Sequence, residues 1–233
     1  MPSQTLLDDL VTANHILYHE GVLDAYGHVS ARDDENPRQF LLARHMAPGI
    51  VTHDDIVTFD LEGKALNANG RKLYSELWIH AAAYAARPDV GGVVHSHSHA
   101  VIPYSVTGVE LRPVCHVGSF LGEGVALFDT QDVAGDTDLL IRNMELGRAL
   151  AKKQGDAPVA LMRGHGSVAT GASLREAVFR AYYTEVNAKL QMDAMRMGKP
   201  ITFLTAGEVK LRGTDRDPTY RRPWEFWKAQ TEE

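Results

Sequence analysis

Three histidines alternate with serines at the end of a short apolar run, at His95, His97 and His99. Alternate residues of an extended chain point to the same face, so this spacing predicts a strand over residues 92–97 with two or three imidazoles on one side. The apolar residues before the first histidine predict that the strand is buried. A buried imidazole needs a partner, because burying an unpartnered polar group is costly. We therefore expect a sheet in which an inner strand ends in a cluster of imidazoles.

The same histidines are candidate metal ligands. Imidazole nitrogen suits zinc, iron, manganese and cobalt, and a catalytic ion commonly has three protein ligands and open positions for substrate. His165 is the candidate third ligand, because the glycines on both sides of it permit an unusual turn and a close backbone approach. The alternative interpretation is a polar strand edge with solvated histidines, or core histidines satisfied by hydrogen bonds. His99 could simply lie at the end of the strand.

Glu76 is the candidate catalytic acid or base. It lies in the first turn of a predicted Ala-rich helix that ends before Pro88. One interpretation is structural, because the helix dipole favours a carboxylate at this position. The functional interpretation is a carboxylate held near the metal, whose pKa an apolar site would raise towards that of a proton donor.

Further residues are candidates for binding an anion. The turn that starts at Gly27 and runs to Ser30 offers backbone N–H groups that can hold an anion. An arginine can bind a carboxylate through two parallel hydrogen bonds, and the alternative for each arginine is a solvated surface position. Three arginines lie beside the segments described above, namely Arg44, Arg71 and Arg163.

Helical and strand-like segments alternate along the chain. Ser3 predicts the start of a helix that ends before Gly21, and the Ser173–Glu176 segment has the form of a capping box that starts a helix reaching about Met197. Further helices are predicted over residues 75–87 and 137–153, and strands over residues 39–43, 56–60, 64–66, 92–97 and 159–162. Strands interleaved with helices predict an α/β domain built around one sheet.

The composition indicates one compact domain. The chain has 233 residues, of which 44% are hydrophobic, and its formal charge of −6 argues against a general nucleic-acid-binding surface. No apolar run approaches the roughly 20 residues of a membrane span, and Asp8 and Asp9 lie where a signal peptide would be basic or apolar. Cys115 is the one cysteine, which fits a reducing compartment, and the role of the adjacent His116 is left open. We expect a cytoplasmic protein with a domain over residues 1–213 and an aromatic tail over residues 214–233 that packs on its own or a neighbouring subunit.

Four motifs in this order resemble those of the class II aldolase/adducin family over about residues 5–205: Gly27-His28-Val29-Ser30, Ser75-Glu76, His95-Ser96-His97 and Gly164-His165-Gly166. The combined spacing is far more specific than any single motif. The resemblance implies that His95, His97 and His165 bind one divalent metal ion, Mn or Zn, with Co or Fe as further options. It also implies that Glu76 is the catalytic acid/base. The expected fold is a three-layer α/β/α domain around a largely antiparallel sheet, and the expected assembly is a homotetramer with active sites at subunit interfaces.

The chain departs from the sugar-phosphate aldolases of this family where those enzymes bind phosphate. They typically show Gly-Asn, Thr-Pro-Ser-Gly and Ser-Ser, where this chain has Gly27-His28, Met46-Ala47-Pro48-Gly49 and Tyr74-Ser75. A phosphate would lose several hydrogen-bond donors by these exchanges. The same segments are similar to a decarboxylase branch that includes 3-hydroxy-2-methylpyridine-4,5-dicarboxylate decarboxylase and the dihydroxyphthalate decarboxylases. We therefore expect an unphosphorylated small-molecule carboxylate as substrate.

The implied reaction is decarboxylation of a hydroxy-aromatic or β-keto (di)carboxylate through a metal-stabilised enolate. His28 would hydrogen-bond the carboxylate that leaves, and Glu76, or water beside it, would return a proton to carbon. Arg44 or Arg71 would hold a second carboxylate. The expected substrate-binding residues are Arg44, Arg71, Ser75 and Gly27.

Three other functions remain open at this point. The chain could be a class II aldolase acting on an unphosphorylated hydroxy-keto acid, which would release an aldehyde rather than CO2. An epimerase is a further relative, although epimerases normally keep the phosphate-binding residues that are absent here. A non-catalytic, adducin-like interaction module would lack a stoichiometric metal ion.

Overall fold

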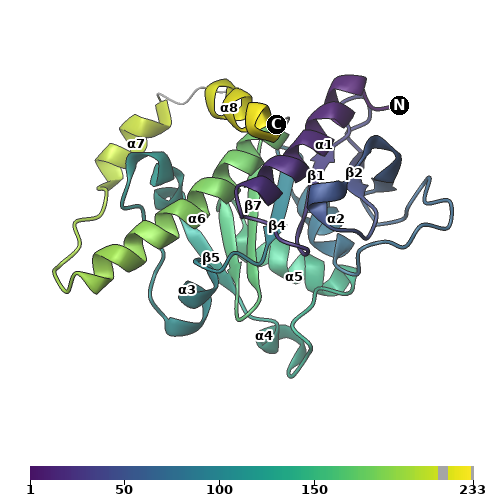
Figure 1. Ribbon diagram of the computed structural model, residues 1–233. Helices are drawn as coiled ribbons and strands as arrows, with labels where there is room; N and C mark the ends of the chain where they lie inside the picture. The colour runs from purple at the N-terminus through teal and green to yellow at the C-terminus, as the bar shows by residue number, and fades with distance from the viewer. Residues whose placement is uncertain (215–219, 232–233) are drawn as a thin grey trace.

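A computed structural model of the chain describes residues 1–214 and 220–231 and contains one seven-stranded sheet (Figure 1). The strand order is β3-β2-β1-β4-β7-β6-β5. Neighbouring strands are antiparallel except β5 and β6, which are parallel. The strands are β1 (His28–Arg32), β2 (Gln39–Ala43), β3 (Ile56–Asp60), β4 (Gly92–Ser96), β5 (Val125–Phe128), β6 (Val159–Met162) and β7 (Gly166–Gly171). The predicted α/β fold with a largely antiparallel sheet is confirmed.

Helices cover both faces of the sheet. In Figure 1, α1 and α6 cross in front of the strands, whereas α2 and α5 lie behind them. The helices are α1 (Gln4–His19), α2 (Leu77–Ala86), α3 (Ile102–Thr107), α4 (Gln131–Ala134), α5 (Met144–Gln154), α6 (Leu174–Arg196), α7 (Ala206–Thr214) and α8 (Arg221–Thr231). Three short 3-10 turns complete the described structure, at Pro48–Ile50, His53–Asp55 and His116–Glu123.

β4 lies in the middle of the sheet, and all five of its residues are buried. Its residue His95 pairs with His28 of β1 on one side and with Val168 of β7 on the other. Glycine allows α6 to lie close to this strand, since a Cβ on Gly92 would lie 2.7 Å from the Leu174 Cα. The histidine-bearing strand is therefore held between two neighbours and beneath a helix.

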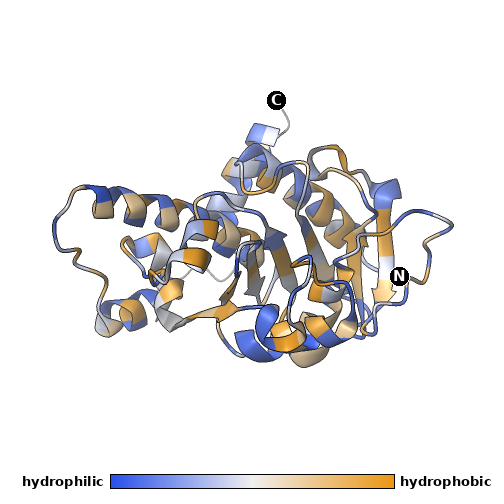
Figure 2. Ribbon diagram, turned by 90° about the horizontal axis from the view of Figure 1, so that it is seen from below, coloured by the Kyte–Doolittle hydropathy of each residue, from blue (hydrophilic) through white to orange (hydrophobic). Residues whose placement is uncertain are grey.

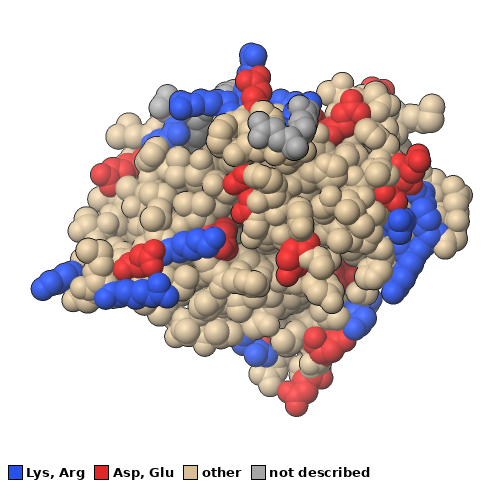
Figure 3. Space-filling model, in the orientation of Figure 1, with Lys and Arg blue, Asp and Glu red and all other residues tan. Residues whose placement is uncertain are grey.

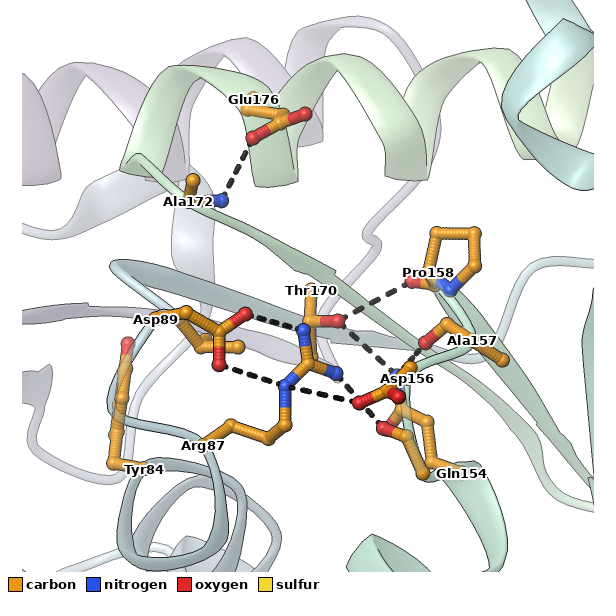
Figure 4. Close-up of polar contacts among 12 residues, drawn as sticks. Tyr84, Arg87, Asp89, Gln154, Asp156, Ala157, Pro158, Thr170, Ala172 and Glu176 are labelled. Carbon is orange, nitrogen blue, oxygen red and sulfur yellow. Dashed lines mark hydrogen bonds and ion pairs between the residues drawn. The ribbon is translucent and has the colours of Figure 1, made fainter. Parts of the chain in front are cut away.

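On the other face, α2 packs closely on α5. A Cβ on Gly147 of α5 would lie only 2.5 Å from the Trp78 carbonyl oxygen of α2, so glycine permits this crossing. Figure 4 shows a second link at the end of α2, where Arg87 forms ion pairs with Asp89 and Asp156. The Arg87 guanidinium also donates to the Gly155 carbonyl at 2.8 Å. The helix crossing at Gly147 and the contacts of Arg87 together hold α2 against the rest of the domain. Glu76 directly precedes this helix.

The apolar core lies on both sides of the sheet, and orange segments recur on the central strands in Figure 2. On the face shown in Figure 3, Lys and Arg lie among Asp and Glu rather than in one continuous basic area. Among the described residues, no helix has both the length and the apolar character needed to cross a lipid bilayer.

Several predicted elements are confirmed with shifted ends. Ser3 and Ser173 accept hydrogen bonds from the backbone N–H groups of Leu6 and Glu176, as expected of residues that cap α1 and α6. The strands predicted over residues 39–43, 56–60 and 159–162 are present, and the strand predicted over residues 92–97 ends at Ser96. β5 and β7 lie outside the strands predicted from the sequence.

Two predictions were wrong. Residues 64–66 do not form a strand, because only the pair Phe59 and Ala65 forms a bridge before the chain turns away. The helix predicted over residues 137–153 begins only at Met144, where Asn143 caps it through its side chain. The preceding residues are irregular, and their backbone makes contacts with the histidine cluster that are described below.

The described part of the tail is helical and packs on the same chain. α8 contacts α1 and α6, and the Trp227 ring lies 4.8 Å from the Tyr182 ring of α6. Residues 215–219 and 232–233, which belong to the predicted tail, lie outside the described residues.

Candidate metal centre and cavity

The three predicted metal ligands converge, although His165 is distant from the others in sequence. The His97 Nε2 atom lies 3.2 Å from the His95 Nε2 atom and 3.1 Å from the His165 Nε2 atom. Glu76 completes the group, and one ligand atom from each of the four residues lies within 4.8 Å of the others. His95 and His165 are buried, so the cluster forms one compact set of donors inside the domain.

Backbone carbonyls determine which nitrogen of two imidazoles carries the hydrogen. The His95 Nδ1 atom lies 3.1 Å from the Ser167 carbonyl, and the His165 Nδ1 atom lies 3.0 Å from the Leu139 carbonyl. A carbonyl oxygen only accepts hydrogen bonds, so each Nδ1 donates and each Nε2 keeps its lone pair. This tautomer is the one that binds a metal through Nε2.

The spacing of these nitrogens fits a shared cation. Two ligand atoms about 2.1 Å from one ion lie about 3.0 Å apart at a right angle and about 3.4 Å apart at the tetrahedral angle. The His97–His165 and His97–His95 nitrogen separations, 3.1 and 3.2 Å, fall between these values. Burial also lowers the pKa of His95 well below its ordinary value, which keeps the imidazole neutral and able to bind a cation. The cluster could therefore hold a metal ion.

Glu76 occupies the N-cap position of α2, but its side chain does not cap the helix. Its Oε1 atom accepts a hydrogen bond from the Ile141 N–H at 2.9 Å, and its Oε2 atom lies 3.5 Å from His165 Nε2 and 3.7 Å from His95 Nε2. The helix-start interpretation is thus incomplete, since the carboxylate points at the histidine cluster.

The expected rise in the pKa of Glu76 is not found. Burial does raise this pKa, but contacts that His165 and His95 make when protonated, together with the Ile141 N–H, lower it more, to about 2. Glu76 is therefore a carboxylate at neutral pH, and its Oε1 atom accepts the hydrogen bond from the Ile141 N–H.

The irregular segment before α5 explains how the cluster is held. Its Leu139 carbonyl orients His165, and its Ile141 N–H orients Glu76. Leu139 has a positive φ of 66°, a conformation that is unusual for a residue other than glycine. A regular helix over residues 137–143 would use these backbone groups internally, so the late start of α5 leaves them available to the site.

A cavity of about 550 Å³ opens beside the cluster. Its lining combines apolar groups, imidazoles and the Glu76 carboxylate, and it contains no lysine or arginine. The lining residues are Ala25, Tyr26, Gly27, His28, His45, Met46, Ala47, Tyr74, Ser75, Glu76, His97 and Leu140. The Tyr74 hydroxyl donates to the Met46 carbonyl at 2.5 Å, which leaves the ring as the face that a ligand would meet. The volume and lining suit a small, partly apolar molecule.

Three other predicted site residues line this cavity. The His28 ring lies next to the His95 ring, with a centroid separation of 5.0 Å, because the two residues are register partners in β1 and β4. Gly27 permits this approach, since a Cβ there would lie 2.9 Å from the His95 carbonyl oxygen and the residue has a φ of 83°. Ser75 is exposed at the cavity, directly before Glu76.

The predicted arginines make other contacts in this chain. Arg44 forms an ion pair with Asp55 at 2.7 Å. Arg71 donates to backbone carbonyls, including those of Asn67, Ala68 and Asp54. Arg163 is paired with Asp129. None of the three arginines lines the cavity beside the cluster.

The remaining histidines that were left open lie outside the cluster. His99 is exposed and lines a separate cavity of about 320 Å³ that also contains Glu185 and Lys189. His116 lies in the 3-10 turn after β4 and α3 and lines neither of these cavities. The structure therefore separates them from the three converging imidazoles.

Sequence reasoning missed His80, which is fully buried behind His28 with Nε2 2.6 Å from His28 Nδ1. Burial lowers the pKa of His80 to about 3, so this imidazole is neutral. The sequence contains a pattern that could have identified His80. Glu76, His80 and Tyr84 are spaced four residues apart and so share one face of the predicted helix.

Comparison with known proteins gives consistent results. Residues 8–192 match the family described as Class II Aldolase and Adducin N-terminal domain. The chain is 36% identical to "Decarboxylase tropJ" of Talaromyces stipitatus, covering 100% of this chain and 96% of that protein. It is 30% identical to the "3,4-dihydroxyphthalate decarboxylase" of Arthrobacter keyseri, covering 86% and 83% of the two chains. The structure also resembles that of an aldolase II superfamily protein from Pseudomonas syringae, with a TM-score of 0.81, 21% identity and coverage of 98% and 92%.

Proposed function

Since this chain belongs to the class II aldolase and adducin family, we propose that it is a carbon–carbon lyase, and specifically a metal-dependent decarboxylase of an unphosphorylated hydroxy-aromatic or β-keto carboxylate. The observation that carries this proposal is the convergence of three imidazoles and one carboxylate beside a partly apolar cavity. Relatives that match most of the chain and are called decarboxylases support the choice of reaction.

His95, His97 and His165 are the proposed ligands of one divalent cation, manganese or zinc, with cobalt and iron as further options. When bound, such an ion acts as a Lewis acid that stabilises negative charge on an oxygen of the substrate. The bare Nε2 atoms of His95 and His165 and their separations from His97 support this assignment.

The other side chains have separate proposed roles. His28 hydrogen-bonds the carboxylate that leaves as CO2, because its ring lies at the cavity next to His95. Glu76 is ionised, so it acts as a hydrogen-bond acceptor for a water molecule whose proton goes to the carbon that loses CO2, and the hydroxide left behind takes a proton from solvent. The Tyr74 ring and the apolar side chains of Met46 and Leu140 pack against the organic part of the substrate.

An unphosphorylated substrate agrees with the lining. A phosphate carries up to two negative charges, and no lysine or arginine lines the cavity to bind them. Ser75 and Gly27 remain the proposed substrate contacts, with a hydroxyl and a backbone N–H respectively. Arg44 and Arg71 are left out of the proposed site, since their guanidinium groups contact Asp55 and backbone carbonyls.

We further propose a homotetramer with active sites at subunit interfaces, in a cytoplasmic setting. Large apolar side chains that are exposed in the single chain support a partner surface, and Tyr26, at the cavity, is 66% exposed. Sedimentation analysis would test the assembly, and a monomeric protein with full activity would contradict it.

A product assay tests the reaction. The purified protein, loaded with Mn or Zn, is mixed with a panel of ortho-hydroxy aromatic acids and β-keto acids, and CO2 release is measured with and without a chelator. We expect chelator-sensitive CO2 release from at least one acid. Release of an aldehyde from hydroxy-keto acids without CO2 would identify an aldolase instead. Failure to bind a stoichiometric ion in several preparations would identify a non-catalytic module.

A further inference from the structure

A chain of four hydrogen-bonded side chains leads from the cavity into the core. His28 Nδ1 lies 2.6 Å from His80 Nε2, and His80 Nδ1 lies 2.6 Å from the Ser30 Oγ atom. The Ser30 Oγ atom lies 2.9 Å from the Tyr84 hydroxyl oxygen. Only His28 reaches the cavity, and Ser30, His80 and Tyr84 are at most 1% exposed. This series of hydrogen bonds therefore ends at His28, which a ligand can reach, on one side and in the apolar core on the other.

Donation along this series of hydrogen bonds can run in two directions, and the distances alone do not select one. Either each group donates towards the cavity, or each donates towards Tyr84. In the first case His28 carries its hydrogen on Nε2, and in the second it carries it on Nδ1. The two cases present opposite surfaces to a bound molecule, a hydrogen-bond donor or a bare lone pair.

Tyr84 selects the direction. Burial raises the pKa of its hydroxyl, so the group keeps its hydrogen and must donate it. Among the residues that the structure describes, the Ser30 Oγ atom is the acceptor available to this hydroxyl. Within residues 1–214 and 220–231, the structure gives this hydroxyl no hydrogen bond to a backbone carbonyl. The opposite direction would leave a buried donor without a partner, which destabilises the folded protein.

The donation from Tyr84 determines which atoms of Ser30, His80 and His28 donate. Ser30 accepts from Tyr84, and its own buried hydrogen then has His80 Nδ1 as its one acceptor among the described residues. Ser30 therefore donates to His80 Nδ1, and the His80 hydrogen is on Nε2. His80 then donates to His28 Nδ1, and the His28 hydrogen is on Nε2. No second hydrogen-bond partner of His28 is found among the described residues, so this N–H remains for a molecule in the cavity.

The geometry points to His80 as a positioning residue that, with Ser30 and Tyr84 behind it, holds His28 as an Nε2–H donor aimed at an anionic group of the substrate. This inference rests on the proposed function, in which His28 contacts the carboxylate that leaves. A carboxylate needs donors, and because the cavity lining has no lysine or arginine it must use neutral ones, to which the His28 N–H would add beside Ser75 and Gly27. The opposite tautomer would direct a lone pair at the carboxylate and repel it.

A spectroscopic experiment tests the tautomer without any substrate. The zinc-loaded protein is labelled with 15N-histidine, and the His28 signals are assigned by comparison with a His28→Gln variant. The 15N shifts distinguish a protonated from a bare ring nitrogen. We expect His28 to be protonated at Nε2 in the wild-type protein. Protonation at Nδ1 would overturn the inference.

Tyr84→Phe tests the origin of the direction, since it removes one buried oxygen and keeps the ring. We expect the Nδ1–H form of His28 to become populated, because Ser30 can then donate or accept. An unchanged His28 spectrum would show that Tyr84 does not set the direction, and would overturn that part of the inference.

Two variants of similar length test His80 itself. In His80→Gln an amide N–H takes the approximate place of Nε2–H, whereas His80→Met has no donor there. We expect kcat for CO2 release to fall about 10- to 100-fold in His80→Met, as for loss of other supporting hydrogen bonds at a site. We expect His80→Gln to recover most of it, with the KM and the zinc content of both variants near wild type.

Equal kcat values for the Gln and Met variants, or zinc loss in both, would show a merely structural role for His80 and overturn the inference. If His80→Met does not fold, the Tyr84→Phe and wild-type spectra decide. If no acid releases CO2, the proposed function fails, but the 15N measurements still decide the tautomer of His28. The two failures are therefore distinguishable.

Discussion

At the residue scale, the carboxylate of Glu76 shows how neighbours determine the chemistry of one group. Burial alone would favour a protonated side chain, but the Ile141 N–H and two imidazoles surround its oxygens. The result is a pKa lowered to about 2, so the group starts a reaction as a base or hydrogen-bond acceptor. In the proposed reaction, the proton that reaches the substrate therefore comes from water at this carboxylate rather than from Glu76 itself.

Glu76→Gln should lower turnover strongly while the three imidazoles still bind the cation. We expect kcat for CO2 release to fall about 10²- to 10⁴-fold, the range for loss of acid–base catalysis. The amide oxygen can still accept from the Ile141 N–H, so the fold should be kept. Steady-state kinetics and metal analysis by mass spectrometry measure the two effects. Full turnover in the variant would exclude a role for Glu76 in the proton transfer.

The protonation of His80 predicts how stability depends on pH. Burial lowers its pKa from 6.5 to about 3 in the folded protein, so between these values the unfolded chain binds a proton that the folded chain does not. The free energy of unfolding therefore falls as the pH falls below 6.5, by up to about 1.4 kcal/mol per pH unit for this group, and its contribution is complete above 6.5.

Urea denaturation between pH 5 and 7.5, with chelator present, would measure this slope. We expect the slope to be smaller in His80→Gln, which has no titrating group at this position. His28 and His95 are also buried with lowered pKa values, so part of the slope should remain. An identical slope in the variant and the wild type would contradict the prediction.

At the scale of elements, close helix packing is permitted by single glycines. At the α2–α5 crossing, the Gly147 position leaves no room for a Cβ, because the Trp78 carbonyl would lie 2.5 Å away. This crossing also supports the site, since α2 begins directly after Glu76 and carries His80 and Tyr84.

Gly147→Ala should therefore destabilise the protein, although alanine is the better helix former. We expect a loss of about 1–3 kcal/mol in the free energy of unfolding, typical of overpacking. Gly207→Ala is the matched control, because a Cβ in α7 would meet only the Thr205 Oγ1 atom at 3.8 Å. Chemical denaturation of both variants compares them, and equal stabilities would show that the two helices can separate without cost.

At the scale of the whole molecule, the candidate metal site connects segments that are far apart in sequence. His95 and His97 come from the end of β4, His165 from the turn between β6 and β7, and Glu76 from the start of α2. A cation bound by these residues would stabilise the folded domain, because the unfolded chain does not hold them together.

Removal of the metal should therefore lower the melting temperature. An ion present at 100 times its dissociation constant contributes about 2.7 kcal/mol, which corresponds to roughly 5–10 °C for a chain of this size. His97→Ala should melt at the same temperature with and without added zinc. His99→Ala is the control, since this exposed histidine lies outside the cluster, and it should keep the full shift. A shift that persists in His97→Ala would place the cation elsewhere.

Much of the site was predictable because its ligands form local patterns. The His95 and His97 pair follows from strand alternation, and the position of Glu76 follows from its helix start. The contacts of Arg44 and Arg71 were not predictable, because an arginine beside a motif can turn to an aspartate or to backbone carbonyls as readily as to a cavity. The late start of α5 was missed for a similar reason, since residues 137–143 have helical composition but make backbone contacts with the site.

The sequence by itself determined the α/β class, the capped ends of α1 and α6, and the residue types that can bind a cation, because these depend on near neighbours and on side-chain chemistry. Only the tertiary structure decided the convergence of His165 with His95 and His97, the ionised state of Glu76 and the contact between His28 and His80. Those properties depend on which donors and acceptors lie within about 3 Å of each group. That proximity is set by the strand register and the helix crossings of the folded chain.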